Sequence, residues 1–411
     1  MEPRRILLVT INYWPELTGI GKYTGEMAEW LVQHGLEVKV VTAPPYYPEW
    51  KVSDGYSSSL YRKEIVSGVT VMRCPLWVSR KPSGLRRILH LASFSITSFP
   101  VMIWTALSWR PNLVFVVEPP FMCAPTALLS AFAGRAESWL HVQDFEVDAA
   151  FELELIRSPR LKSILQSVES WLMKKFDRVS TISEQMLKRL SLKQVPLDRQ
   201  KLFQNWVDVD TIYPVNGIPA LKSELGFPDG VSMLLYSGNM GEKQGLEIII
   251  EVAKALNGRD DVIFLLCGGG ASMDRLKEAS FGIKNLRYIP LQPLSKLNEL
   301  LNLADIHLLP QRSDVEDLVM PSKLTNMMAS GKPVVATARV GTQVERIVRE
   351  CGFVVEPGDV TAFVEAILAL LGNPEKRKEL GARGREIACE KWEKNNVLSS
   401  VFSDYISVTG K

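Results

Sequence analysis

The sequence predicts an α/β protein made of two doubly wound halves, each with a mostly parallel sheet covered by helices. The first half begins with Ile6–Ile11, an apolar run typical of a buried parallel strand, and a second strand follows at Val38–Thr42. The alternation then restarts with a strand at Met233–Ser237, a helix at Leu246–Leu256 and a strand at Ile263–Cys267. The chain has 411 residues, which is long enough for two domains with substantial cores.

Composition narrows the class of protein. The chain is 46% hydrophobic and 23% charged, as expected of a globular protein, and its net charge of +2 argues against a dedicated nucleic-acid binder. The five cysteines form no C-x-x-C pair, which favours a reduced cytoplasm and neither a disulfide framework nor a zinc site. The amino-terminus leads directly into a strand at Arg4–Thr10, so we expect no cleavable signal peptide.

The most informative stretch is Pro310–Thr337. It predicts a short helix that starts at Pro321 and stops at Gly331, followed directly by a buried strand at Val334–Ala336. The free N–H groups at the start of such a helix, together with Lys323, could bind a phosphate. An ordinary αβ unit with a solvated lysine explains the same pattern.

Two segments of this stretch resemble a known family. ASGKPVVAT, preceded by ADIHLLPQ, is similar to the donor-binding region of the family 4 glycosyltransferases, and VMPSKLTNMMASGKPVVA resembles enzymes of bacterial exopolysaccharide synthesis, including colanic acid. The resemblance covers nearly the whole chain. It implies the GT-B fold, in which two Rossmann-like domains face each other across a cleft. The implied parts are an acceptor-binding domain at 1–208, a nucleotide-sugar-binding domain at 209–385, and a helix at 386–411 that crosses back to the first domain.

The resemblance also implies a set of donor-binding residues. The glycine-rich loop after the first strand would contribute Gly19 and Gly21, although a plain loop explains it too, and a nicotinamide fingerprint fits poorly because Pro15 interrupts the turn. The second half would contribute Gly238, Asn239, Gly268, Gly269, Glu316, Ser322 and Asn326.

The sequence departs from the family where the donor diphosphate is bound. Asn239 stands where many relatives have an arginine and Gln244 where they have a lysine, and the family's pair of glutamates is replaced, the second by Asn326. Lys243 and Lys323 are therefore the candidate cations that would stabilise the leaving group. These departures put the identity of the donor in doubt more than the class of reaction.

A second group of candidates follows the strand at Ser138–Phe145. Chemistry in open α/β sheets lies beyond the carboxyl ends of the strands. Asp144 matches the aspartate of a His-Asp pair found in relatives, whereas Gln143 occupies the histidine position and His141 lies two residues earlier on the same strand face. The resemblance thus implies Asp144 and His141 as catalytic candidates. A strand-end aspartate that caps the next segment is the alternative.

The segment from Arg86 to Arg110 has about 22 mostly apolar residues between arginines. It fits a buried helix, a helix on a membrane surface, or, despite several serines and threonines, a membrane span. The D-x-D pattern at Asp208 and Asp210 lies in the linker, where we interpret it as a coincidence. The four histidines are dispersed, so we expect no metal and no cofactor.

The sequence therefore predicts a retaining, metal-independent hexosyltransferase of the cytoplasm, and it leaves open a peripheral position on the inner face of the cytoplasmic membrane. By resemblance, it would move fucose from GDP-fucose, or a hexose from a UDP-sugar, to a polyprenyl-diphosphate-linked saccharide during exopolysaccharide synthesis. The leaving phosphate would accept the acceptor's proton, with Asp144 or His141 in an orienting role. The alternatives are a non-catalytic paralogue that binds a nucleotide-sugar and a sugar-nucleotide epimerase, which needs acid–base groups that the chain scarcely offers.

Overall fold

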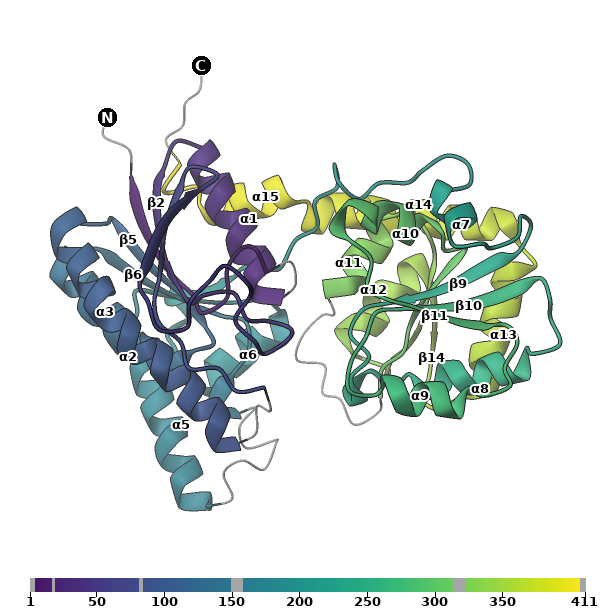
Figure 1. Cartoon of the computed structure of the whole chain (residues 1–411), viewed down its shortest axis with the longest axis horizontal. Coiled ribbons are helices and arrows are strands. Elements are labelled where there is room, and N and C mark those ends of the chain that lie inside the picture. Colours follow the sequence, from purple (N-terminus) through teal and green to yellow (C-terminus); the bar gives the residue numbers. More distant parts are fainter. Residues whose placement is uncertain (1–3, 17–18, 81–83, 149–157, 313–321, 407–411) are drawn as a thin grey trace. The chain divides into compact units, whose positions relative to one another are not determined.

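The computed structural model describes residues 4–406 except 17–18, 81–83, 149–157 and 313–321. The chain forms two compact units, each with its own sheet and hydrophobic cores (Figure 1). Unit 1 joins Met1–Gln204 to Leu398–Lys411, and unit 2 is Asn205–Val397. The chain thus passes between the units after Gln204 and after Val397, where the sequence suggests 208 and 385.

Unit 1 contains an eight-stranded sheet with the order β3-β4-β2-β1-β5-β6-β7-β8. The strands are β1 (Arg5–Val9), β2 (Glu37–Thr42), β3 (Arg62–Val66), β4 (Val69–Arg73), β5 (Leu113–Glu118), β6 (Glu137–Val142), β7 (Arg178–Thr181) and β8 (Gln200–Leu202). All neighbours are parallel except β3 and β4. The central strand β5 is buried along its whole length, as expected for an apolar run covered on both faces.

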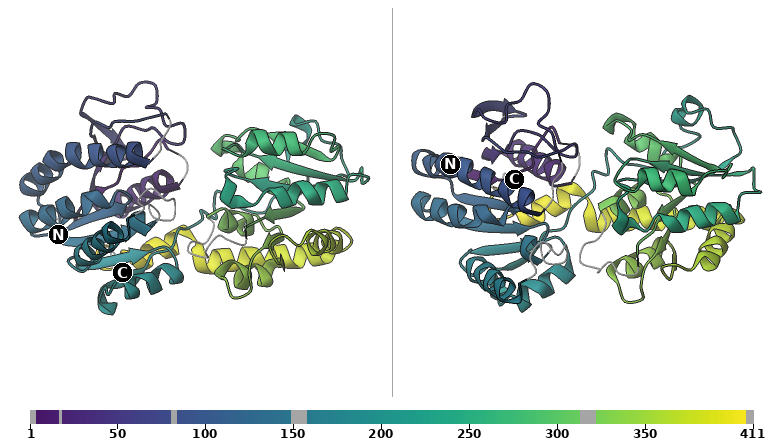
Figure 2. Two further views of the ribbon diagram at one scale, coloured as in Figure 1. Left: turned by 90° about the horizontal axis from the view of Figure 1, so that it is seen from below. Right: turned by 60° about the horizontal axis from the view of Figure 1, so that its bottom comes forward.

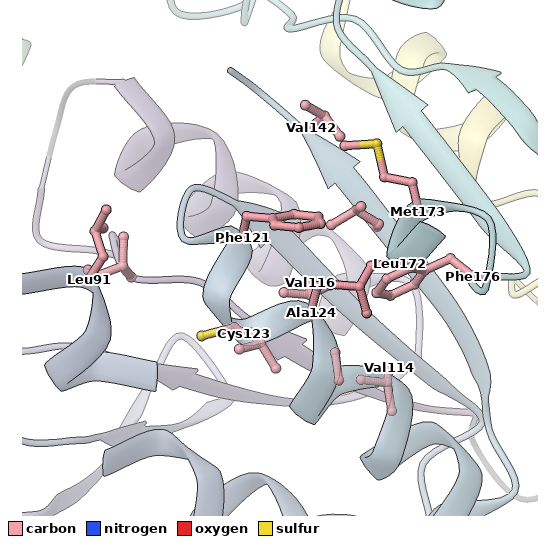
Figure 3. Close-up of a cluster of buried hydrophobic side chains, with 14 of the residues drawn as sticks. Leu91, Val114, Val116, Phe121, Cys123, Ala124, Val142, Leu172, Met173 and Phe176 are labelled. Atoms are coloured by element: carbon pink, nitrogen blue, oxygen red, sulfur yellow. The ribbon is translucent and has the colours of Figure 1, made fainter. Parts of the chain in front are cut away.

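Helices cover both faces of this sheet. One face carries α2 (Gly84–Trp109), α3 (Ala124–Gly134), α5 (Pro159–Met173) and α6 (Glu184–Leu192), whose inner side chains share one core with the strands. Figure 3 shows this core, with Leu91 of α2, Ala124 of α3 and Met173 of α5 around β5 and β6. The other face carries α1 (Gly19–Gln33), as Figure 1 shows.

The carboxyl-terminal segment packs onto unit 1 after α15 (Lys394–Val401). Phe402 is fully buried, and its ring lies 6.0 Å from that of Phe115 and 5.8 Å from those of Trp139 and Phe203, measured between centroids. Because side chains alternate along β5, these rings lie on the face opposite the core that contains Val114 and Val116. The described part of the tail therefore belongs to unit 1.

Unit 2 contains a six-stranded parallel sheet with the order β11-β10-β9-β12-β13-β14. Its strands are β9 (Ser232–Ser237), β10 (Val262–Cys267), β11 (Leu286–Ile289), β12 (Ile306–Leu309), β13 (Val334–Thr337) and β14 (Gly352–Val355). Its helices are α7 (Ala220–Glu224), α8 (Glu247–Ala255), α9 (Met273–Ala279), α10 (Leu297–Asn302), α11 (Ser322–Ala329), α12 (Gln343–Cys351), α13 (Val360–Leu371) and α14 (Pro374–Trp392). Separate cores lie on the two faces, one with α8 and α13 and the other with α11, α12 and α14 (Figure 2).

The strand orders mark where each unit can bind a ligand. In a doubly wound sheet, the crevice opens at the carboxyl ends of the two strands where the order reverses direction. That position lies between β1 and β5 in unit 1 and between β9 and β12 in unit 2. The loops after β1, β9 and β12, together with the helices α1 and α11 that follow them, contain most of the candidate residues.

Helix α11 ends as the sequence predicts. Gly331 follows it with φ +71°, a left-handed conformation that disfavours other residues. A Cβ at this position would also lie 2.7 Å from Cγ of Pro214. Glycine is thus required both by the backbone and by the close approach of the linker, and the chain turns directly into β13.

Candidate active site

In unit 2, the loops after β9 and β10 are fastened to each other through their backbones. The N–H of Gly238 donates to the carbonyl of Cys267 at 3.0 Å, and that of Met240 donates to Gly269 at 2.8 Å. Gly238 has φ +142° and Gly268 has φ +135°, and a Cβ on Gly268 would lie 2.1 Å from the carbonyl oxygen of Gly238. The structure thus brings Gly238, Gly268 and Gly269 together at the predicted edge, with Asn239 in the same loop.

Lys323 lies at the same edge, in the first turn of α11. Its Nζ donates to the hydroxyl of Tyr236 and to Oε1 of Gln244, both at 2.9 Å, and lies 4.4 Å from the centroid of the Tyr236 ring. A Cβ on Gly238 would be 3.5 Å from this amine. Burial lowers the pKa of Lys323 to about 8. Gln244, which occupies the family's lysine position, therefore meets a lysine supplied by another element.

Other predicted donor residues are only partly placed. Ser322 is the exposed first residue of α11, and Asn326 is partly buried one turn later on the same helix. Glu316 and the side chain of Lys243 lie outside the described part of the chain, so their roles remain predictions.

In unit 1, the two predicted catalytic residues, Asp144 and His141, differ in their exposure to solvent. Asp144 is exposed beyond the end of β6, whereas His141 is 4% exposed within that strand. The His141 ring contacts the Ser180 hydroxyl through Nδ1 and the Gln143 amide nitrogen through Nε2, both at 2.9 Å. Burial lowers its pKa to about 3, so the ring is neutral at ordinary pH. His141 is thus placed as a support for Gln143, and Asp144 is the exposed candidate.

Buried carboxyl groups hold the loop that carries Asp144. Glu118, at the end of β5, accepts from the N–H of Glu146 at 3.2 Å, and Glu146 accepts from the N–H of Phe121 at 2.7 Å. Glu118 is fully buried, and its pKa is raised by burial first and by the charges of Glu169 and Glu146 next. The loop is therefore tied to the adjacent strand through two buried carboxyl groups whose pKa values are raised by burial.

An ion-paired layer lies beside these groups. Lys193, directly after α6, pairs with Glu169 of α5, which has no exposed surface, and with Asp148 at 3.0 Å. Burial raises the pKa of Glu169 to about 7 despite the neighbouring lysine.

The sequence did not predict a role for Glu118 or Glu169. A glutamate at the end of an entirely apolar strand was a signal for Glu118, whereas nothing local distinguishes Glu169 from a solvated helix residue.

The glycine-rich loop of unit 1 is built around Glu16. This buried carboxylate accepts from Asn12 Nδ2 at 2.7 Å and from the N–H of Tyr46 at 2.8 Å. A Cβ on Gly21 would lie 2.7 Å from that of Glu16, so glycine is needed for this packing. Gly19 begins α1 with φ +58° and has no atom near its missing Cβ. The role of both glycines toward a donor stays a prediction.

The linker aspartates have a structural role. Asp208 pairs with Lys394 and accepts from the N–H groups of Asp210 and Thr211 at 3.1 and 3.0 Å. The D-x-D pattern thus forms a turn in the linker, held by the Asp208 side chain. Within the described ranges, no group of three or more His, Cys, Asp or Glu side chains is arranged to hold a metal ion.

A cavity of about 360 Å³ lies at the carboxyl edge of the unit 2 sheet. It is lined by Gly245, Glu247, Ile248, Gln311, Arg312, Thr337, Pro357 and Gly358. These residues come from the chain that leads into α8, the loops after β12 and β14, and the end of β13, and none of them is a predicted donor residue. The cavity lies beside the point where the strand order reverses, so it is large enough and well placed to hold part of a ligand.

Both halves of the chain match known families. Residues 18–206 match the glycosyl transferase 4-like domain, and residues 218–387 match the glycosyl transferases group 1. The chain is 40% identical over 412 residues to WcaI of Escherichia coli (strain K12), whose name assigns it to colanic acid biosynthesis as a glycosyl transferase, covering 97% of this chain and 99% of WcaI. It is 22% identical to the N-acetyl-alpha-D-glucosaminyl L-malate synthase of Bacillus anthracis, covering 98% and 97% of the two chains.

Solved structures share the fold along the whole chain. Sucrose-phosphate synthase from Thermosynechococcus elongatus superposes with a TM-score of 0.74 at 18% identity, covering 98% of each chain. WaaG, a glycosyltransferase of lipopolysaccharide biosynthesis, gives a TM-score of 0.67 at 14% identity, covering 98% of this chain and 100% of that one. The predicted fold class is confirmed. The chain belongs to the GT-B glycosyltransferases that pair a family 4-like amino-terminal domain with a group 1 carboxyl-terminal domain.

Proposed function

We propose that this glycosyltransferase moves a sugar from GDP-fucose or a UDP-hexose to a polyprenyl-diphosphate-linked saccharide, with retention of configuration, during assembly of an exopolysaccharide of the colanic acid type. The likeness to WcaI supports the pathway. The observation that carries the reaction is the position of Lys323, whose amine lies against Gly238 at the carboxyl edge of β9.

The donor's diphosphate is the group that this edge would bind. It leaves with negative charge, which needs a cation or fixed N–H dipoles to stabilise it in the transition state. Lys323 supplies the cation, and the first turn of α11 behind it adds the positive end of the helix dipole. A bound diphosphate would raise the lowered pKa of the Lys323 amine and so keep it charged. This pairing needs no metal, and activity in the presence of EDTA is the expected outcome.

The acceptor would meet Asp144 in unit 1. Its carboxylate is exposed on a loop that Glu118 and Glu146 hold in place, which suits a group that orients an acceptor hydroxyl. In this mechanism the leaving phosphate takes the hydroxyl proton as the acceptor attacks from the same face as the leaving group. A trapped glycosyl–enzyme adduct or a product of inverted configuration would contradict it.

Donor binding is tested with Lys323→Met, which keeps the side-chain length and removes the charge. The wild type should be stabilised by one class of nucleotide-sugar without magnesium, by about 2.7 kcal/mol at a concentration 100 times the Kd. The variant should bind that donor about 10- to 100-fold more weakly, as expected for the loss of a charged hydrogen bond. Thermal-shift titrations with GDP- and UDP-sugars measure both values.

Lys332→Met is the matched control. Lys332 is also a partly buried lysine of unit 2 whose pKa is lowered by burial, but it precedes β13 and so lies at the amino end of the sheet. Its variant should bind donor like the wild type. If donor binding is weakened equally in both variants, or if it requires magnesium, the proposed donor site is wrong.

Turnover separates this function from the two alternatives. A transferase consumes nucleotide-sugar only when a saccharide acceptor is present and releases the nucleoside diphosphate. An epimerase converts the nucleotide-sugar alone, and a non-catalytic paralogue leaves it unchanged. Chromatography of the reaction with and without a lipid-linked acceptor distinguishes the three results.

A further inference from the structure

Helix α2 of unit 1 is apolar on both sides. Its inner side contributes Phe94 and Met102 to the core, both fully buried. Its outer side carries a second stripe of exposed large apolar side chains: Leu85, Leu89, Ile96, Phe99 and Leu107. Their spacing of three, four, seven or eight residues places them along one side of the helix. The core explains the inner stripe and leaves the outer one without a partner among the described residues.

The neighbouring helices extend this outer surface. On α3, Leu129 and Phe132 are exposed, the latter by 83%. On α5, the exposed apolar residues are Leu161, Ile164, Val168 and Trp171, again at helical spacing. The inner sides of all three helices share one core, so the helices form a single layer on one face of the sheet (Figures 1 and 3). We call the exposed apolar residues of α2, α3 and α5 the outer surface of this layer.

The charges of this layer have one sign. The sequences of α2 and α3 contain no acidic residue, and the single one in α5, Glu169, is buried and paired with Lys193. The exposed charged residues on these helices and at their ends are basic: Arg86, Arg110, Arg135, Arg160, Lys162 and Lys175. A broad apolar surface with basic residues around it is complementary to a bilayer that contains anionic lipids.

A bilayer surface fits this layer better than a membrane span. In the described ranges, α2 is the one helix long and apolar enough to cross a membrane, but a third of its most apolar window is buried against the protein. Lipid cannot surround a helix whose other side is part of the core. A helix of 26 residues is about 39 Å long, which allows a wide contact in the plane of the interface. The exposed Trp104 and Trp171 are residues that favour that interface.

We propose that the outer surface of α2, α3 and α5 is a docking surface for an anionic lipid bilayer. This inference extends the proposed function, because a polyprenyl-linked acceptor would lie in the same bilayer. It stands on its own observations, since vesicle binding requires neither donor nor acceptor.

Vesicle flotation of the full-length protein tests the proposal. The wild type should float with vesicles of phosphatidylcholine and phosphatidylglycerol at a 70:30 ratio, and less with phosphatidylcholine alone or in high salt. The double substitution Ile96→Ser with Leu107→Ser should lower the partition coefficient at least tenfold, and so should Phe132→Ser with Trp171→Ser. All four side chains are exposed, so the melting temperature should not change.

Phe281→Ser is the matched control, because Phe281 is 94% exposed but belongs to unit 2. Its partition should equal that of the wild type. Absence of wild-type flotation, or equal flotation of all variants, overturns the proposal. A second copy of this chain is the other partner that could bind this surface, and light scattering tests for it. If the wild type is a dimer, and the double variants are monomers that still bind vesicles, the surface joins two copies of the chain and the proposal is overturned. Thermal shifts with the donor, measured on the same variants, distinguish this proposal from the proposed donor site. If the donor site is wrong, the donor shifts are absent but flotation is unchanged.

Discussion

Glu118 is a carboxyl group whose protonation the fold itself controls. It has no exposed surface, and its pKa is raised by burial and by Glu169 and Glu146. In the pH range between the unfolded and the folded pKa, the folded protein keeps a proton that the unfolded chain has lost. The free energy of unfolding contributed by this group therefore falls as the pH rises through that range.

Replacing this glutamate by glutamine should stabilise the protein at high pH. Glu118→Gln keeps an oxygen that can accept from the N–H of Glu146 and removes the ionisable proton. We expect a higher free energy of unfolding than the wild type at pH 8 and a smaller difference at pH 5. Urea unfolding at both pH values measures it. The exposed Glu278→Gln should show no such trend, and a Glu118→Gln variant that is less stable at pH 8 would contradict the assignment.

The surroundings of Lys323 could be predicted from the sequence only in part. The proline before it and the glycine after its helix were sufficient to predict a helix start with a lysine at a phosphate site. Its partners were not predictable, because Tyr236 and Gln244 lie 87 and 79 positions away in the sequence and meet it only when β9 and α11 are packed. Likewise, His141 was offered as catalytic from its strand position, and only its neighbours Ser180 and Gln143 reveal a supporting role.

At the scale of elements, the paired loops after β9 and β10 depend on glycine. Gly268→Ala would place a Cβ 2.1 Å from the carbonyl oxygen of Gly238 at a φ of +135°, so both the contact and the backbone would be strained. We expect a loss of roughly 2 to 4 kcal/mol in the free energy of unfolding, together with weaker donor binding. Chemical denaturation and donor titration measure the two effects.

The adjacent glycine provides the control for this prediction. Gly269 has no atom within 4 Å of its missing Cβ and no left-handed φ, so Gly269→Ala should change stability by less than about 1 kcal/mol. If both variants lose the same stability, the contact with Gly238 is not the cause.

Elements differ in how far local sequence predicts them. The strands β1, β9, β10 and β13 were predicted because buried parallel strands are continuous apolar runs. The edge strand β3 was missed, since RKEIV is mostly exposed and polar and pairs antiparallel with β4 alone. For α2, the sequence left burial, membrane contact and a span open, because a helix that is apolar all round fits each of them. Its packing against β5 and α3 shows that its inner side is buried, and it leaves the role of the outer side open.

At the scale of the whole molecule, the two units have separate cores, and the proposed diphosphate site around Lys323 belongs to unit 2. Calorimetry of the full-length protein should therefore show that a nucleotide-sugar raises the transition of unit 2 by several degrees and leaves that of unit 1 nearly unchanged. Eight of the ten tryptophans belong to unit 1, so tryptophan fluorescence follows mainly unit 1 while calorimetry follows both units. Equal shifts of both transitions would show that the units unfold together.

The covalent route of the chain has a practical consequence. Arg4 near the amino-terminus bonds the backbone carbonyl of Asp404, so the ends of the described chain lie side by side in unit 1. Because these ends are close together, a short peptide can join them. The chain can then be reopened between Gln204 and Asn205, one of its two passages between the units, without removing a residue. Such a circular permutant would have one tether between its units in place of two, and would isolate what the second tether contributes to catalysis.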